Sequence, residues 1–451
     1  MIGVDKMKNV SSWKKALACS LSFLLVAMAG LTSASAQTVV PINGTPPALT
    51  PVTINDGAGD QYDPHISGDW VAYTSDSSIR YYNFVTNTDA EIPMGSSARD
   101  LLSDISGSKI VFSRVITAVK TAVMVFDAAT PLIPPVEIDF APAGTNRIGS
   151  AIGGNTVAYI DFGLHGNGEV VIHDLTTATS QRITNDSLFA QNPSVSPDGA
   201  VVTWEQCSTS TANCDILQAV KSGAVWSVSA ASATANPEAN PDSNGSLVVY
   251  DSIRGPDRGD IFWSPVGGGA EVQLQLPGVE ANPSIAGNFI AFEGRPTLFS
   301  TSDIFVYDIT TNLLYQITDT LLVTEQLNDI TVLPDGRIRV VWGSDEDGFD
   351  HRNVHAATFS LYSPTDLLQQ LIDKVAELDL RRGIANSLNA KLENAQAALA
   401  AAQSADSSSA CGMLSAFIHE VQAQSGKAIT TQDATQLINL ANQVRLGLAC
   451  P

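Results

Sequence analysis

The chain has 451 residues, of which 44% are hydrophobic, and its formal net charge is −22. Nucleic acids and anionic membrane surfaces attract clustered Lys and Arg, so this acidic balance disfavours both as partners. A chain of this length exceeds one ordinary hydrophobic core, and we therefore expect two folded domains.

Residues 1–36 have the pattern of a signal peptide. The first fifteen residues contain four lysines, residues 16–31 form an apolar stretch, and residues 34–36 are small, as a cleavage site requires. A membrane anchor is the alternative, but the apolar run is short for one and no charged stop-transfer cluster follows it. We expect the mature chain to be exported, either to the periplasm or out of the cell, without stable membrane insertion.

A sequence pattern recurs seven times between residues 38 and 361. Each copy has a short apolar stretch, a turn that contains Gly, and an alternating strand that ends in an aromatic residue. The turn glycines are 39 to 49 residues apart: Gly68, Gly107, Gly154, Gly199, Gly245, Gly287 and Gly336. A period of this length, built from strands and tight turns, is typical of a β-propeller.

Each copy continues with a polar hairpin, a third strand and a fourth strand, such as residues 303–308 and 315–318. The seventh copy ends at Phe359 without a fourth strand. Residues 52–54 resemble the fourth strand expected at residues 181–184, so we predict that they close the last blade and remove two exposed sheet edges. The predicted fold of residues 38–361 is an all-β seven-bladed propeller.

Three of the copies carry a more specific signature, in residues 192–199, 236–242 and 282–285. Their Asn-Pro and Ser-Pro-Asp-Gly motifs resemble the repeat of the TolB-like propeller family. The protein after which the family is named has a six-bladed propeller and an attached α/β domain, and no such α/β domain is visible in this sequence. The resemblance implies a propeller, and a periplasmic role in the cell envelope is one alternative that it raises.

Composition changes after Ser363-Pro364, and residues 363–451 read as a small all-α four-helix bundle. Thr365 or Asp366 is expected to cap the first helix and Gly383 to end it. The second helix carries Leu388 to Leu399, and the third carries Met413 to Val421 and stops at Gly426. Thr431 is expected to cap the fourth.

This segment resembles the bacterial module called FIMAH. The resemblance rests on residues 371–375, 386–392, 414–421 and 429–441. Such modules are C-terminal accessories of varied secreted bacterial proteins, so the resemblance implies secretion and no particular chemistry.

Four cysteines follow the expected signal peptide, and an even number in an exported chain favours disulfides. Cys207 and Cys214 flank a polar hairpin tip, and Cys411 and Cys450 bracket the last two helices. We predict the pairs Cys207–Cys214 and Cys411–Cys450. A metal site is the alternative, but the sequence has no Cys-x-x-Cys motif and no Cys/His cluster.

The best metal candidates are Asp345, Asp347 and Asp350, which alternate around Gly348 as in a calcium loop. The twelfth position, where an EF-hand has Glu, is Ala356. A solvated hairpin explains the same residues, and it is the interpretation we favour. No other cofactor is predicted.

Other candidates for chemistry have structural explanations. The sequence lacks the Gly-x-Ser-x-Gly motif of propeller-capped serine hydrolases. The Asn-Pro and Asp-Gly pairs are expected to be turn residues. The aromatic residues that end the second strands are expected to be core between blades and not a ligand-stacking ring; they are Tyr73, Phe112, Tyr159, Trp204, Tyr250, Phe292 and Trp342.

We therefore predict an exported bacterial scaffold without enzymatic activity. It would present one face and a central funnel to a protein or glycan partner, with the contacts on loops. A glycan hydrolase or lyase with paired carboxylates in the funnel is one alternative. A TolB-like envelope component is the other.

Overall fold

The computed structural model describes residues 42, 44–46, 49–95, 99–140, 144–163, 166–209, 212–254, 259–348, 351–360, 363–378, 380–401, 408–448 and 450. The expected signal peptide lies outside these residues. The chain divides into two compact units, one made mostly of strands and one that contains the helices.

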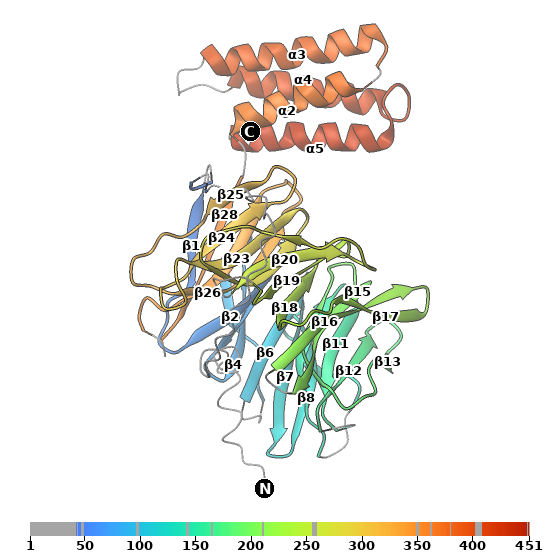
Figure 1. Ribbon diagram of the computed structural model, residues 1–451. Helices are drawn as coiled ribbons and strands as arrows, with labels where there is room; N and C mark the ends of the chain where they lie inside the picture. Colours follow the sequence, from blue (N-terminus) through green and yellow to red (C-terminus); the bar gives the residue numbers. More distant parts are fainter. Residues whose placement is uncertain are drawn as a thin grey trace, which may run out of the picture. The chain divides into compact units, whose positions relative to one another are not determined.

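The strands form seven four-stranded sheets, which confirms the seven-bladed propeller (Figure 1). The first three blades are β2 (Gln61–Ser67), β3 (Trp70–Ser75), β4 (Ser78–Asn83) and β5 (Thr88–Glu91); β6 (Arg99–Ser106), β7 (Lys109–Thr117), β8 (Lys120–Asp127) and β9 (Val136–Glu137); and β10 (Arg147–Gly153), β11 (Thr156–Asp161), β12 (Glu169–Asp174) and β13 (Thr179–Arg182).

The remaining four blades follow the same order from first to fourth strand. They are β14 (Phe189–Val195), β15 (Val201–Thr209), β16 (Ala212–Ser222) and β17 (Val225–Ser232); β18 (Glu238–Ser243), β19 (Leu247–Ser252), β20 (Asp260–Pro265) and β21 (Val272–Gln273); β22 (Val279–Ala286), β23 (Phe289–Arg295), β24 (Asp303–Asp308) and β25 (Leu313–Gln316); and β26 (Glu325–Val332), β27 (Ile338–Ser344), β28 (Asn353–Phe359) and β1 (Thr50–Asn55). In the last sheet β1 lies beside β28, in the place that fourth strands take elsewhere.

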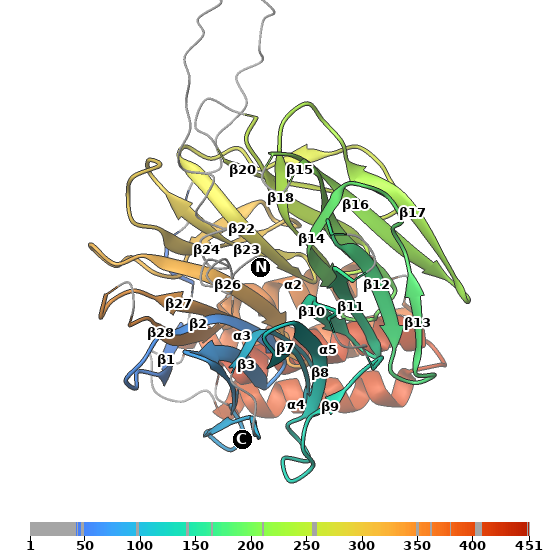
Figure 2. The ribbon, with the colours of Figure 1, turned by 90° about the horizontal axis from the view of Figure 1, so that it is seen from below.

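The first strand of each blade lies nearest the axis, and the fourth strand lies at the rim (Figure 2). Consecutive first strands contact one another, as β2 and β6 do. Two of the fourth strands, β13 and β25, begin and end two residues before the predicted positions. Element boundaries are the least certain part of a sequence-based prediction, because the end of a strand leaves only a weak pattern.

The core lies between blades. Second strands are buried on both faces, as all six residues of β11 show. Phe112 packs in one cluster with Ile79 of the first blade, and Trp204 packs in one cluster with Ile160 of the third. Six of the seven aromatic residues are 0% exposed and Trp342 is 5% exposed, which confirms that they belong to the core.

The expectation of a turn was wrong for three of the four Asn-Pro pairs, whereas Asn236 and Pro237 lie in the loop between β17 and β18. Asn192, Asn240 and Asn282 each lie inside a first strand, at a bulge where the pairing with the second strand shifts. Each has a φ near +50°, a left-handed conformation that Asn tolerates better than most residues. A residue with positive φ stands at this place in all seven first strands, and a register shift is seen there in the first six blades. The seven residues are Asp63, Leu102, Gly149, Asn192, Asn240, Asn282 and Leu327.

The C-terminal unit contains four helices: α2 (Pro364–Glu377), α3 (Arg382–Ala401), α4 (Ser408–Gln424) and α5 (Thr431–Gly447). Three expected ends were wrong. Thr430, not Thr431, caps α5, because its Oγ1 accepts the backbone N–H of Asp433 at 3.1 Å. Ser363 caps α2 in a capping box with Asp366, because Pro364 is well suited to the first helical position. Gly383 does not end the first helix but lies in the first turn of α3.

One apolar cluster, which includes Leu371, Leu392, Phe417 and Leu437, joins all four helices. A disulfide joins Cys411 in α4 to Cys450, as predicted. None of the helices in the described part of the chain is long and apolar enough to cross a membrane.

Candidate functional site: the axial ring and the loop face

Seven equivalent side chains surround the propeller axis, each two residues after the bulge of its first strand. We call them the axial ring: His65, Asp104, Ala151, Ser194, Asp242, Ser284 and Asp329. His65 Nδ1 lies 3.6 Å from a carboxylate oxygen of Asp104 and 3.6 Å from one of Asp329. These three side chains, from neighbouring blades, keep one-fifth to one-third of their surface exposed.

The three ring aspartates each bind the next blade. Asp104 Oδ2 accepts the backbone N–H of Ile152 at 2.7 Å, and Asp329 Oδ2 accepts that of Ile66 at 2.8 Å. Asp242 binds Ile285 in the same way at 2.8 Å. The second carboxylate oxygen of each of these aspartates also accepts a hydrogen bond.

Asp104 and Asp329 accept the N–H of their following residues through those second oxygens, and Asp242 accepts the hydroxyl of Ser194. Carboxylates engaged in this way join blades to one another, and they are poorly placed to act as paired catalytic acids and bases.

The ring also controls the charge of His65. Burial by itself would lower the pKa of His65, but the carboxylates of Asp329, Asp104 and Asp63 overcome that effect and raise the pKa to about 10. Burial raises the pKa of Asp104 to about 6, although His65 opposes the shift. The ring therefore holds an imidazolium between two aspartates at neutral pH.

A second set of carboxylates follows the aromatic residues of three successive second strands: Glu205, Asp251 and Glu293. Each binds the bulge Asn of its own blade and the bulge backbone N–H of the next blade. Asp251 Oδ2, for example, accepts Asn240 Nδ2 at 2.7 Å and Asn282 N at 2.9 Å. Burial, reinforced by the charges of Glu205 and Glu293, raises the pKa of Asp251 to about 7.

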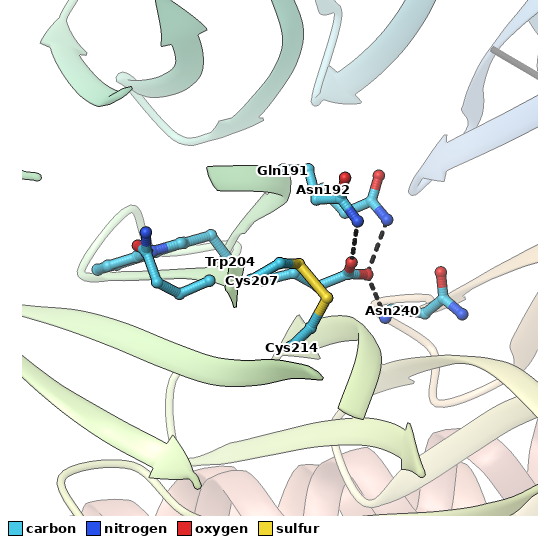
Figure 3. The surroundings of a disulfide bond; sticks show 8 residues. Gln191, Asn192, Trp204, Cys207, Cys214 and Asn240 are labelled. Atoms are coloured by element: carbon cyan, nitrogen blue, oxygen red, sulfur yellow. Dashed lines mark hydrogen bonds between the residues drawn. A yellow bond between two sulfur atoms is a disulfide. The ribbon is translucent and has the colours of Figure 1, made fainter. Parts of the chain in front are cut away.

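The Glu205 member of this set lies beside a disulfide. Gln191, Asn192 and Asn240 donate to the Glu205 carboxylate at 2.6 to 2.8 Å. Figure 3 shows these three residues converging on one carboxylate beside the disulfide. Cys207 and Cys214 face each other across β15 and β16 and form the predicted bond.

Glu205, Cys207 and Cys214 also make up the one group within the described ranges that has three closely spaced metal-ligand atoms. Both sulfur atoms are used in the disulfide, and a thiolate, not a disulfide sulfur, is the metal ligand.

The calcium candidates lie in the hairpin between β27 and β28. Asp345 accepts a hydrogen bond from the backbone N–H of Thr324, in the loop before β26. Asp347 Oδ2 accepts Asn353 Nδ2 at 2.9 Å, and Asp350 lies outside the described residues. The two described aspartates therefore bind neighbouring protein groups.

We define the loop face as the end of the propeller at which the first strands begin. Since neighbouring strands run in opposite directions, this end also carries the hairpins between second and third strands and the connections between blades. Its exposed apolar side chains are Ile116, Val119, Phe140, Leu188, Phe299, Leu321 and Leu322.

Two loops of the sixth blade carry the most exposed members of that set. Phe299 is 95% exposed, Leu321 89% and Leu322 85%. The bases of the two loops are joined, because Glu325 N donates to Ser302 O at 2.8 Å and Ser302 Oγ donates back to Glu325 O at 2.7 Å. We call residues 296–301 and 319–324 the apolar loop pair.

The sequence prediction missed the axial ring. His65 is one of six histidines, and nothing nearby in the sequence distinguishes it. In the copies without an insertion, however, the ring residue stands three positions before the turn glycine, as His65 does before Gly68 and Asp104 before Gly107. Comparing that position across the copies would have found the ring.

Neither a protein-family model nor a curated protein matches the chain. Among solved structures, the β-propeller domain of the Trilobed protease from Pyrococcus furiosus is similar, with a TM-score of 0.50 and 12% identity, over 68% of this chain and 98% of that one. Its description gives it an open velcro topology, whereas here β1 lies beside β28 in the last sheet.

TolB structures also match. Putative TolB from Agrobacterium tumefaciens is 17% identical over 49% of this chain and 82% of that one, with a TM-score of 0.39. TolB from Acinetobacter baumannii is 17% identical over 66% and 78%, with a TM-score of 0.39. None of the comparisons confirms the FIMAH resemblance. What they show for this chain is its fold: a β-propeller similar to known propeller domains.

Proposed function

We propose that the chain is an exported, non-enzymatic propeller scaffold that binds a protein partner at its loop face. The apolar loop pair carries this proposal. Large apolar side chains that are exposed together on neighbouring loops are a mark of interaction surfaces. Phe299, Leu321 and Leu322 bury almost nothing in the chain itself.

The backbone of Leu322 supports the same conclusion. Its φ is +67°, a region in which a bulky side chain is strained by about 1–3 kcal/mol. Strain of this kind persists where the surroundings or a function require it, and Leu322 gains no burial in return. A partner that covers the side chain would provide the missing burial energy.

The chemistry around the loop pair indicates what the partner presents. Asp319, Glu346 and Asp347 are exposed on the same and the adjoining loops, and Thr324 N binds Asp345 between them. The proposed partner surface is therefore an apolar patch with a basic rim. Such a rim raises the association rate more than the final affinity.

The alternative of a glycan hydrolase around the axis is not favoured by the axial ring, because both oxygens of each ring aspartate accept hydrogen bonds from the protein, one of them from the next blade. The helical unit, with its resemblance to FIMAH, would serve as an accessory for attachment or association. Calcium binding at Asp345 and Asp347 stays a proposal, which titration with calcium alone would test.

The experiment compares the wild type with two variants in the capture of bacterial envelope proteins. The double variant Phe299→Ser, Leu321→Ser removes the apolar loop pair, and Val85→Ser is the matched control, since Val85 is 73% exposed in a turn at the opposite end of the first blade. Loss of one defined partner by about tenfold or more in the double variant alone supports the proposal. Equal capture by all three chains contradicts it.

A further inference from the structure

A cleft of about 300 Å³ lies between the third and fourth blades. One wall comes from β12 and β13, and it includes Asp174 and Gln181. The other comes from the hairpin of β16 and β17, with Lys221 and Trp226. Strands β13 and β17 lie near each other at the rim in both views (Figures 1 and 2).

The wall with Trp226 is formed by a longer hairpin than other blades have at their third and fourth strands. Strand β17 has eight residues, whereas the other fourth strands have two to six. A two-residue turn joins it to β16, and Gly223 takes a φ of +63° there, as such turns require. The inner side of Trp226 packs against the apolar cluster that contains Ile172, so the indole is held in place and partly exposed.

Polar groups surround this indole. Asp174 Oδ1 accepts the backbone N–H groups of Thr176 and Thr177, which fixes the carboxylate. Its other oxygen lies 3.6 Å from Lys221 Nζ, and that ammonium group lies 5.6 Å from the centre of the Trp226 ring. Within the described part of the chain, the indole N–H of Trp226 and the side-chain amide of Gln181 have no hydrogen-bond partner.

We propose that this cleft binds one neutral sugar ring of an oligosaccharide. A pyranose has faces of C–H groups, which stack on an indole, and a rim of hydroxyls, each of which donates and accepts hydrogen bonds. The cleft offers the indole face, the indole N–H, the Gln181 amide and the Asp174 carboxylate. Its volume is at the small end for ligand sites and suits a single ring.

The charges favour a neutral sugar over an anion. Lys221 is the cation of the cleft, and Asp174 neutralises it at 3.6 Å. An anionic ligand would have to compete with that carboxylate, whereas a neutral hydroxyl can bind the pair without separating it. The sugar site lies at the rim of the third and fourth blades, and the proposed protein-binding loops belong to the sixth, so the two proposals are independent.

The test uses the full chain and three soluble probes: maltotriose, cellotriose and chitotriose. Saturation-transfer NMR at millimolar sugar would detect binding, and tryptophan fluorescence would follow it. We expect at least one probe to bind, Trp226→Ala to weaken binding about tenfold or more, and Trp226→Phe to keep part of it. Val228→Ala is the matched control, because Val228 lies on the same strand and does not line the cleft.

A second variant keeps the test decisive if Trp226→Ala disturbs folding. Gln181 is exposed on β13, so Gln181→Ala should leave the fold intact and still weaken binding several-fold. Failure of all three probes to bind would overturn the proposal, as would binding that neither substitution alters. A galacturonate trimer is the anionic control probe: its binding without binding of any neutral probe, and the loss of that binding in Lys221→Ala, would also overturn the proposal of a neutral sugar.

Discussion

The guanidinium of Arg352 forms a two-point ion pair with Asp60, which lies 292 residues earlier in the chain. Arg352 Nε donates to Asp60 Oδ1 at 2.7 Å and Nη2 donates to Oδ2 at 2.5 Å. The backbone adds a third link, because Gln61 N donates to Arg352 O at 2.9 Å. The pair therefore fastens the start of the first blade to the last blade, beside the strand that completes that blade.

Arg352→Ala should lower the free energy of unfolding by about 3 kcal/mol, because Arg352 is 5% exposed and its removal leaves Asp60 without its cation. Chemical denaturation followed by near-ultraviolet circular dichroism would measure the loss. Arg337→Ala is the control: its pair with Asp335 is more exposed and should contribute about 1 kcal/mol or less. Equal losses in the two variants would contradict the role given to Arg352.

The bulge of the fifth blade gives a second prediction. Asn240→Ala should cost about 2 kcal/mol of stability, because Asp251 loses a hydrogen bond in a buried site and Ala is strained at a φ of +51°. Asn240→Gly removes the bond without the strain, so it should be about 1 kcal/mol less damaging. Thermal unfolding of both variants separates the two effects, and Ala and Gly variants of equal stability would exclude the strain.

The axial ring predicts a dependence on pH. The carboxylates around His65 raise its pKa to about 10 in the folded chain, above its ordinary value of 6.5. A raised pKa means that the charged imidazolium stabilises the fold fully below about pH 6.5, and that this contribution is lost as the pH rises towards 10.

The stability advantage of the wild type over His65→Gln should therefore be largest near pH 6 and shrink by about pH 10. Urea denaturation of both chains across this range would measure the advantage. An advantage that stays constant or grows with pH would show that His65 is not charged in the ring.

The two disulfides should differ in what they stabilise. Cys411–Cys450 closes a loop with a sequence separation of 39 and Cys207–Cys214 one of 7, so the chain-entropy model assigns about 4 and about 2.5 kcal/mol. Replacing Cys411 and Cys450 by Ala should lower the unfolding temperature of the helical unit and leave that of the propeller unchanged. Calorimetry of this variant and of its Cys207, Cys214 counterpart would check the assignment, and a propeller transition that moves in both variants would contradict it.

The repeat made the architecture predictable. Every blade keeps its turn, such as Gly107, and a buried aromatic residue at the same phase, such as Phe112, because all blades pack against neighbours in the same way. A search for one repeated residue type does not find the axial ring, since its members include His65, Ala151 and Asp329, which share a position and no chemistry. Only a comparison of that position across the copies finds it. Asn240 was misread because its partners, Glu205 and Asp251, lie on two different blades, and a sequence does not show distances between blades.

The partner-binding proposal is tested most directly by photocrosslinking in cells that export the chain. A photoreactive amino acid would replace Phe299 in one variant and Val85 in another, at opposite ends of the propeller. We predict one discrete crosslinked protein from position 299 and none from position 85, with the crosslink weakened when Leu321→Ser is added. No crosslink at position 299, or the same products at both positions, would contradict the loop face as the binding site.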